Sequence, residues 1–364
     1  MTPLGPTNAA VTPLGRKIAL RIARTGPITL ADYMAECLLD PQYGYYTTRD
    51  PLGRGGDFVT APEISQMFGE LLGLWLAQCW LDQGAPAPFA LAELGPGRGT
   101  LMADVLRATR GVPGLHEAMR VCLMEASPTL RAAQAAALAG YNPQWHDSVT
   151  TLPELPLFLL ANEFLDALPI RQFHRHAAAW QEVMVTEEDG RLAFALSPPI
   201  HVSLLADRIA DTRPGDIVEL CPALRTVVGE VGARLSRHGG AALFVDYGGW
   251  HSRGDTLQAV RNHGFTDPLA EPGLADLTAH VDFEAVARAA PPARATGMVE
   301  QGAFLERLGL HARARQLAQG MSGDALLIHR AATERLTAAD AMGTVFKALA
   351  LYPQTAPLPP GFAA

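Results

Sequence analysis

The sequence predicts an α/β fold with a mostly parallel, Rossmann-like central sheet. Four short apolar runs, each bounded by turn residues or acids, occur at residues 89–94, 120–125, 156–161 and 241–246. The first two alternate with helical stretches at residues 100–110 and 128–139. Continuous apolar strands that alternate with helices are typical of a parallel sheet covered by helices on both faces.

Composition narrows the class of protein. The chain has 364 residues and a net charge of −8, with 48% hydrophobic and 18% charged residues, which describes a folded protein with a sizeable core. The negative charge argues against nucleic-acid binding, and no apolar run approaches the roughly 18 residues of a membrane span. Four widely separated cysteines predict buried, reduced thiols and no metal site: Cys37, Cys79, Cys122 and Cys221.

Three regions follow along the chain. Residues 1–84 are predicted to form an N-terminal helical cap, because helical patterns there end at Gly-Pro or Asp-Pro steps. Residues 85–352 form the core, with an insertion at about 171–235 that contains a β-hairpin turning at Asp189-Gly190. The apolar run before residue 353 suits a last, antiparallel edge strand, and residues 353–364 form a C-terminal tail.

A glycine-rich loop follows the first apolar run, in the stretch "LAELGPGRGT". Gly95, Gly97 and Gly99 allow the backbone to approach a nucleotide closely at the start of a helix. A dinucleotide fingerprint would need its third glycine where Thr100 stands, and a phosphate-binding P-loop would need a lysine before Thr100. The loop therefore predicts a nucleoside ligand other than a dinucleotide or a nucleoside triphosphate.

Two acids frame this loop. Glu93 would repel a pyrophosphate, whereas it suits a ligand that carries an ammonium group or ribose hydroxyls. Glu125 ends the second strand ~30 residues after the loop, where an acid can accept both ribose hydroxyls. S-adenosylmethionine has such groups and no phosphate. Asp147 and Ser148 follow a weak third strand, where they either contact the adenine or only form a turn.

A second polar cluster follows the fourth strand, in "LLANEFLDALPIRQF". Asn162, Glu163 and Asp166 would lie at the sheet edge where ligands bind in such folds. We expect Asn162 to contact the cofactor and Glu163 and Asp166 to be catalytic, because carboxylates hold a guanidinium bidentately and prepare one nitrogen to attack a methyl group. The alternative is a helix N-terminus with acids in its first turn.

Other polar residues have no assigned role. Asp246 ends the strand at 241–246, and His263 and His280 follow it. Residues 53–65, including "GDFVTAPEIS", are expected to close over the cofactor.

Seven separated motifs resemble the MidA family and occur in the same order. They are "GDFVTAPEISQMFGE", "AELGPGRGTLMADVLR", "ANEFLDALPIRQF", "VDYG", "RGDTLQAVRNH", "DLTAHVDF" and "GTVFKALAL". The resemblance covers residues 14–352. It implies a class I methyltransferase fold and S-adenosylmethionine as methyl donor, with Gly95, Gly97, Gly99 and Glu125 at the cofactor site.

The resemblance also implies a protein substrate. Mitochondrial members of the family are complex I assembly factors that act as protein arginine methyltransferases and symmetrically dimethylate an arginine of a complex I core subunit. We expect the same chemistry here, on that subunit or a bacterial equivalent, in the cytoplasm of a bacterium or the mitochondrial matrix of a eukaryote. The alternatives are a non-catalytic complex I assembly chaperone and, against the loop's spacing, a nicotinamide-dependent oxidoreductase.

Overall fold

The computed structural model describes residues 12–49 and 60–363, which group into two compact units. The larger unit comprises residues 60–166, 223–251 and 280–363, and the smaller comprises residues 12–49, 167–222 and 252–279. Each unit is thus assembled from segments that are far apart in the chain. The domain limits expected from the sequence, at residues 84, 171, 235 and 352, stay predictions.

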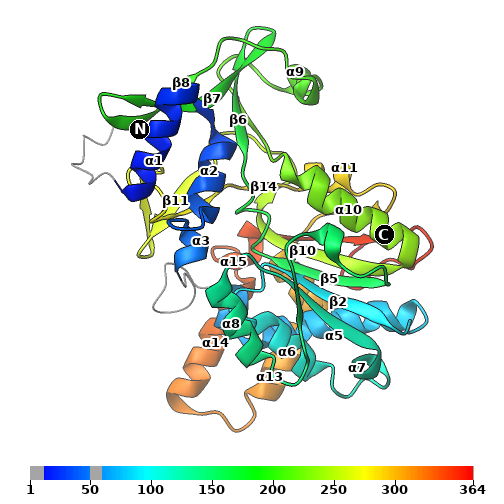
Figure 1. Ribbon diagram of the computed structural model, residues 1–364. Coiled ribbons are helices and arrows are strands. Elements are labelled where there is room, and N and C mark those ends of the chain that lie inside the picture. The colour runs from blue at the N-terminus through cyan, green and yellow to red at the C-terminus, as the bar shows by residue number, and fades with distance from the viewer. Residues whose placement is uncertain (1–11, 50–59, 364) are drawn as a thin grey trace. The chain divides into compact units, whose positions relative to one another are not determined.

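The larger unit is built on a twisted sheet, and its main strands follow the order β4-β3-β2-β5-β10-β17 (Figure 1). The bounds of these strands are β2 Phe89–Leu94, β3 Met119–Met124, β4 Gln144–His146, β5 Leu157–Asn162, β10 Gly240–Gly249 and β17 Phe346–Tyr352. Neighbours from β4 to β10 pair parallel, and β17 pairs antiparallel with β10. The four predicted strands and the mostly parallel α/β fold are confirmed. The antiparallel direction of the last strand is also as expected.

Short strands complete the sheet. They are β14 Val281–Asp282, β15 Arg294–Ala295 and β16 Val299–Glu300. β14 pairs parallel with the end of β10. β15 and β16 pair with the outer side of β17, so β17 is not the outermost strand as the sequence suggested. The two-residue lengths of β15 and β16 explain why no sequence pattern marks them.

Helices cover both faces of the sheet, with α5 and α6 on one side and α10 on the other (Figure 1). The strands are apolar on both faces for this reason. The helices of this unit are α4 Ala61–Ile64, α5 Gln66–Asp82, α6 Thr100–Ala108, α7 Leu115–Ala118, α8 Pro128–Ala137, α10 Ala223–His238, α11 Phe283–Ala289, α12 Gln301–Arg307, α13 Leu310–Leu317, α14 Gly323–Thr337 and α15 Met342–Val345, with a 3-10 turn η1 at Val149–Thr151.

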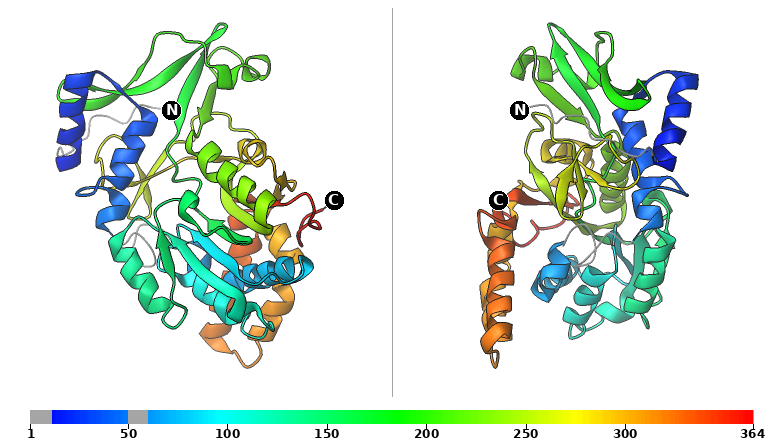
Figure 2. Two further views of the ribbon diagram at one scale, coloured as in Figure 1. Left: turned by 45° about the vertical axis from the view of Figure 1, so that its right-hand side comes forward. Right: turned by 90° about the vertical axis from the view of Figure 1, so that its left-hand side faces the viewer.

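The α13–α14 pair extends beyond the helices that cover the sheet (Figure 2). It is anchored by Glu70 of α5, which is 3% exposed. Glu70 forms ion pairs with Arg313 of α13, at 2.7 Å, and with Arg107 of α6. A buried carboxylate that binds two guanidinium groups thus joins three helices.

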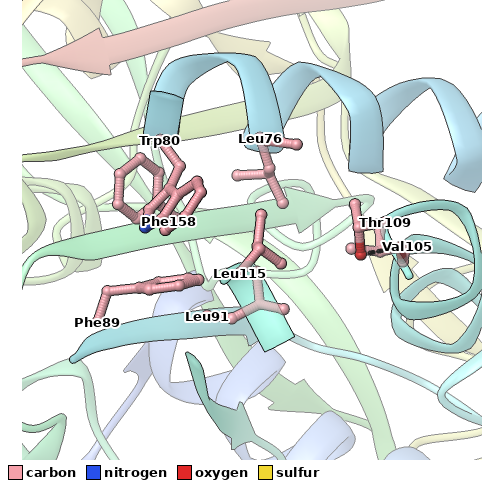
Figure 3. A pocket seen from close by; sticks show the side chains of 9 residues that line it. Leu76, Trp80, Phe89, Leu91, Val105, Thr109, Leu115 and Phe158 are labelled. Atoms are coloured by element: carbon pink, nitrogen blue, oxygen red, sulfur yellow. Dashed lines mark hydrogen bonds between the residues drawn. The ribbon is translucent and has the colours of Figure 1, made fainter. Parts of the chain in front are cut away.

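An apolar pocket lies in the core between α5 and the sheet (Figure 3). Trp80, Phe89 and Phe158 line it together with aliphatic side chains, and the hydroxyl of Thr109 donates to the carbonyl of Val105 in the same helical turn. Because this pocket is lined by core side chains and not by the ends of the strands, we assign it to packing.

The smaller unit contains an antiparallel sheet of order β1-β7-β6-β9, with β8 paired to β7. The predicted hairpin is β7 and β8, which meet at Asp189-Gly190, where both residues have positive φ. α1 and α2 pack on β7, and a second sheet has the order β12-β11-β13. The bounds are α1 Pro13–Thr25, β1 Ile28–Thr29, α2 Leu30–Leu39, α3 Tyr45–Thr48, β6 Arg171–His176, β7 Ala179–Glu188, β8 Arg191–Leu196, η2 Ser203–Leu205, α9 Arg208–Asp211, β9 Ile217–Leu220, β11 Gln258–Arg261, β12 Gly264–Thr266 and β13 Asp276–Thr278.

The sequence also makes predictions about the surroundings of the four cysteines, the grouping of possible metal ligands and the character of the helices. Cys37, Cys79 and Cys122 are buried, as predicted, whereas Cys221 is half-buried because it lies just beyond the end of β9. Within residues 12–49 and 60–363, no group of three or more His, Cys, Asp or Glu side chains is placed to hold a metal ion. In the same residues, no helix combines the length and apolar character that a membrane span needs.

Candidate active site

The order of the strands locates the site. β3 and β4 lie on one side of β2, whereas β5 and β10 lie on the other. The order in which the parallel strands are added to the sheet therefore changes side at β2. Open α/β sheets bind ligands beyond the carboxyl ends of the strands at such a point. The predicted residues of both polar clusters lie at or just beyond these ends of β2, β3 and β5.

The glycine loop leaves β2 and starts α6. Gly95, Gly97 and Gly99 have φ values of +64°, +54° and +83°, which residues with a Cβ atom rarely adopt. Gly99 is the N-cap of α6, and its N–H donates to the carbonyl of Pro96 at 2.8 Å. The spacing of the three glycines thus reflects three separate left-handed positions in one turn.

Glu93 is buried beneath this loop, with 3% of its surface exposed. Its Oε2 atom has no hydrogen-bond partner among the described residues. Burial, with a smaller contribution from the charge of Glu125, raises the pKa of Glu93 to about 8. An unsatisfied buried carboxylate is costly, so a cationic ligand at this place would stabilise its ionised form.

Glu125 follows β3 and is held in one orientation. Its Oε1 accepts from the N–H of Ser127 at 2.8 Å, and its Oε2 accepts from Nε2 of Gln134 at 3.1 Å. Burial raises the pKa of Glu125, whereas these hydrogen bonds oppose the rise. Each oxygen keeps acceptor capacity, which two ribose hydroxyls could use.

Gln134 of α8 is a residue that the sequence did not indicate. Its side chain is fully buried, and its Nε2 also donates to the carbonyl of Gly97 at 2.6 Å. Its Oε1 accepts from Nε1 of Trp145 at 2.8 Å. Gln134 therefore connects the glycine loop to Glu125. A glutamine in an alanine-rich helix has no local signal that would reveal this role.

Asp147 and Ser148 follow β4, as predicted, but their side chains make local contacts. The side chain of Asp147 is 88% exposed and forms an ion pair with Arg131 at 2.6 Å. The Oγ of Ser148 accepts from the N–H of Thr150 and caps the turn η1. These contacts agree with the turn alternative, and contact with adenine stays a prediction.

The second cluster follows β5. Asn162 is the last residue of the strand, and the next residues form a turn without a helix, so the helix N-terminus considered for this segment is not present. Glu163 has a φ of +51°, and its N–H donates to the carbonyl of Val245 at 2.9 Å. A non-glycine residue in this conformation is strained, and such strain is frequent at functional sites.

The carboxylate of Glu163 has its two oxygens in different surroundings. Oε1 accepts from the N–H of Ala61 and from Nδ2 of Asn162, both at 3.1 Å. Oε2 accepts no hydrogen bond from the described residues. Loss of surrounding water, followed by the charge of Asp166, raises the pKa of Glu163 to about 7, whereas Arg335 of α14 opposes the rise. Glu163 and Asp166 together therefore favour the binding of a cationic group beside them.

Asp246 joins these acids from the neighbouring strand. Its side chain is 1% exposed, and its Oδ2 accepts from the N–H groups of Phe164, Leu165 and Asp166 at 3.1, 2.9 and 3.3 Å. Burial raises the pKa of Asp246, and the charges of Asp166 and Glu163 raise it further, whereas the backbone donors oppose the rise. The sequence left the role of Asp246 open.

Helix α4 contacts both clusters. The N–H of Ala61 donates to Glu163, and Oε1 of Glu63 accepts from the hydroxyl of Thr100 at 2.6 Å, at the start of α6. Residues 60–65 thus lie across the glycine loop and the Glu163 turn, which agrees with the expected closing segment. Residues 53–59 of that segment lie outside the described residues.

The two histidines with open roles belong to different units. His280 is in the larger unit, where its ring packs edge-on against Tyr247 with centroids 5.3 Å apart. Burial and the charge of Lys347 lower the pKa of His280. His263 lies in the turn between β11 and β12 of the smaller unit, with a φ of +61°.

The residues present fit S-adenosylmethionine. The glycine loop has no side chains at three positions, Glu93 has an unsatisfied buried oxygen, and Glu125 has spare acceptor capacity. The buried Oδ1 of Asn162 also has no partner among the described residues. These donors and acceptors suit a ligand with an amino group, a sulfonium and a ribose.

Comparisons with known proteins agree with this geometry. The model of a family described as "Putative S-adenosyl-L-methionine-dependent methyltransferase" matches residues 71–299. The chain is 39% identical over 374 residues to the mitochondrial protein arginine methyltransferase NDUFAF7 homolog of Drosophila melanogaster, covering 93% of this chain and 85% of the relative. It is 37% identical over 340 residues to mitochondrial protein arginine methyltransferase NDUFAF7 of Homo sapiens, covering 86% and 77%.

A solved structure shares the whole fold. The crystal structure of a COG1565 superfamily member from Burkholderia thailandensis, bound to S-adenosyl-homocysteine, superposes with a TM-score of 0.82 and 31% sequence identity. The similarity covers 96% of this chain and 92% of that chain. The resemblance inferred from the seven motifs is therefore confirmed.

Proposed function

Because this chain belongs to the family of S-adenosyl-L-methionine-dependent methyltransferases, we propose that it methylates an arginine of a protein substrate. The observation that supports an arginine acceptor is the acid cluster at the end of β5. Burial, followed by the charge of Asp166, raises the pKa of Glu163 to about 7 in the absence of a cation. A guanidinium, which stays charged at physiological pH, would relieve this repulsion and donate its in-plane N–H groups to both carboxylates.

The acids would act on the acceptor in two ways. Oε2 of Glu163 and the carboxylate of Asp166 hold the guanidinium and draw its charge away from one nitrogen, whose lone pair then attacks the methyl carbon. When bound, S-adenosylmethionine supplies that methyl group on a sulfonium, whose sulfur keeps the electron pair of the broken C–S bond. The new C–N bond replaces an N–H bond, and the proton leaves the nitrogen through Oε2 of Glu163 to water. The methylated guanidinium keeps its charge of +1.

Alignment supplies the remaining rate enhancement. Asn162, at the end of β5, is expected to contact the methyl donor, and its Nδ2 donates a hydrogen bond to Glu163. The end of one strand would thus contribute to binding both the methyl donor and the methyl acceptor. Holding the nitrogen in line with the methyl carbon removes several kcal/mol of the barrier by proximity. The group that would leave is a neutral thioether, so breaking the C–S bond would need no proton donor from this chain.

We further propose that the substrate is a respiratory complex I core subunit or its bacterial equivalent, and that the product is symmetric dimethylarginine. The relatives named as protein arginine methyltransferases are mitochondrial, which supports a mitochondrial matrix location for a eukaryotic chain. For a bacterial chain we propose the cytoplasm.

The test uses purified protein, methyl-labelled S-adenosylmethionine and the candidate subunit. We expect label on one arginine, loss of label when that arginine is replaced by lysine, and dimethylarginine by mass spectrometry. Glu163→Gln should reduce transfer by at least about 100-fold while cofactor affinity changes little. Calorimetry should detect binding of S-adenosylmethionine and none of NADH.

The chaperone alternative makes a different prediction. A non-catalytic assembly factor would restore complex I in cells that lack the protein even with Glu163→Gln, and no methyl group would appear on the subunit. That result would reject the proposed activity.

A further inference from the structure

Asp246 holds the turn that carries the proposed acceptor acids. One oxygen of its carboxylate accepts three consecutive backbone N–H groups, those of Phe164, Leu165 and Asp166. The other oxygen accepts the N–H of Tyr247 at 2.9 Å. The carboxylate is thus surrounded by backbone donors on both sides, and it is 1% exposed.

The turn depends on an external acceptor. Residues 164–166 follow β5 and precede no helix, so their N–H groups have no regular secondary structure to satisfy them. Glu163 has a strained φ of +51°, which the neighbouring strand maintains through the bond from its N–H to the carbonyl of Val245. Two successive residues of β10, Val245 and Asp246, therefore determine the path of the backbone from Glu163 to Asp166.

We propose that Asp246 is a positioning residue for methyl transfer, which orients Glu163 and Asp166 through the backbone of their turn and does not touch the substrate. This inference rests on the proposed function, in which those two acids bind the acceptor guanidinium. An amide at position 246 cannot replace the carboxylate, since its NH2 group would face backbone donors on one side or the other.

The size of the effect follows from geometry. A displacement of catalytic groups by about 1 Å can reduce the rate by about 100-fold without any change in the groups themselves. Within the part of the chain that the structure describes, the hydrogen bonds of the Asp246 carboxylate go to the N–H groups of residues 164–166 and of Tyr247, and not to the glycine loop. Cofactor affinity should therefore depend much less on Asp246 than methyl transfer does. The signature is a loss of kcat with an almost constant Kd for S-adenosylmethionine.

The experiment uses the full chain with Asp246→Asn. We expect kcat for the protein substrate to fall about 100-fold and the calorimetric Kd for S-adenosylmethionine to change less than about threefold. Hydrogen exchange should accelerate at the amides of residues 164–166. The matched control is Glu219→Gln in the smaller unit, a buried acid that likewise accepts a backbone N–H, from Thr256 at 2.9 Å. It should leave both kcat and exchange at residues 164–166 unchanged.

The outcomes separate this inference from the proposed function. A kcat near that of the wild type in Asp246→Asn, with faster exchange at residues 164–166, would overturn the positioning role. If Glu163→Gln keeps full activity while Asp246→Asn loses it, the assignment of the acceptor acids fails, whereas the turn-holding role of Asp246 stands.

A second variant distinguishes loss of the positioning role from loss of the fold. Asp246→Ser has a smaller side chain and one hydroxyl acceptor, so it should fold and show the same loss of kcat and faster exchange. Unfolding of both variants, with Glu219→Gln folded, would assign Asp246 to the stability of the larger unit and overturn the proposal.

Discussion

A Cβ atom on Gly95 would lie 3.0 Å from Cδ2 of Phe164, so the glycine loop packs directly against the turn that carries Glu163 and Asp166. Gly95 also has a φ of +64°. The position therefore needs glycine for two independent reasons, backbone conformation and close approach. Because Phe164 lies between Glu163 and Asp166, the methyl-donor loop and the proposed acceptor acids are mechanically connected.

Gly95→Ala should damage both halves of the site. The left-handed backbone alone costs about 1–2 kcal/mol in a residue with a Cβ atom, and contact with Phe164 adds strain to the turn. We expect the Kd for S-adenosylmethionine to rise at least about tenfold and methyl transfer to fall further. The control is Gly84→Ala, since Gly84 has a φ of +84° and open space around its Cβ position. Equal effects of the two variants would contradict the contact with Phe164.

The rate should depend on pH through Glu163, because only the ionised carboxylate can hold a guanidinium. Its pKa of about 7 means that the protonated form dominates below that value. We therefore expect kcat/KM to rise with pH up to about 7 and then level. Arg335 lowers the pKa of Glu163, so Arg335→Gln should move this inflection to higher pH. A profile that is flat between pH 6 and 8 (roughly one unit on each side of this pKa) would exclude Glu163.

Replacing Gln134 should weaken the cofactor site without touching the ligand. Gln134→Met removes the donor to Gly97 and Glu125 and keeps a similar volume. We expect the Kd for S-adenosylmethionine to rise about tenfold, corresponding to the loss of one or two hydrogen bonds of about 1 kcal/mol each. Trp145→Phe removes only the donor to Gln134 and should have a smaller effect. Calorimetry on both variants compares the two increases in Kd. A larger increase for Trp145→Phe would argue against the role of Gln134 in connecting the glycine loop to Glu125.

Glu93 should make the ligand-free protein less stable as pH rises. Its pKa is about 8 in the folded state against a usual 4.5, so the folded state binds more protons between these values and the free energy of unfolding falls across that window. Glu93→Gln removes this dependence, and the variant should exceed the wild type in stability increasingly toward pH 8. It should also bind S-adenosylmethionine more weakly. Denaturant unfolding at several pH values measures the first effect, and parallel curves for both proteins would contradict it.

Much of the fold could be predicted from local patterns. The runs at residues 89–94 and 156–161 correspond to β2 and β5 within one residue, because strands buried on both faces are continuous apolar segments. The order of the strands could not be predicted, nor could the two-residue strands β15 and β16 that pair with β17, since pairing depends on contacts between distant segments. The grouping of α1 and α2 with β7 is another such contact.

For the site, the sequence by itself determined which groups stand at the strand ends. Glycines at residues 95, 97 and 99, and acids at residues 93, 125, 163 and 166, are visible because each lies near the end of an apolar run or just after it. Only the tertiary structure decided what holds them. Gln134 and Asp246 act through hydrogen bonds to backbone that is 37 and 80–82 residues away, and bonds over such separations exist only after the sheet has formed. Local pattern specifies the reacting groups, whereas long-range packing specifies their orientation.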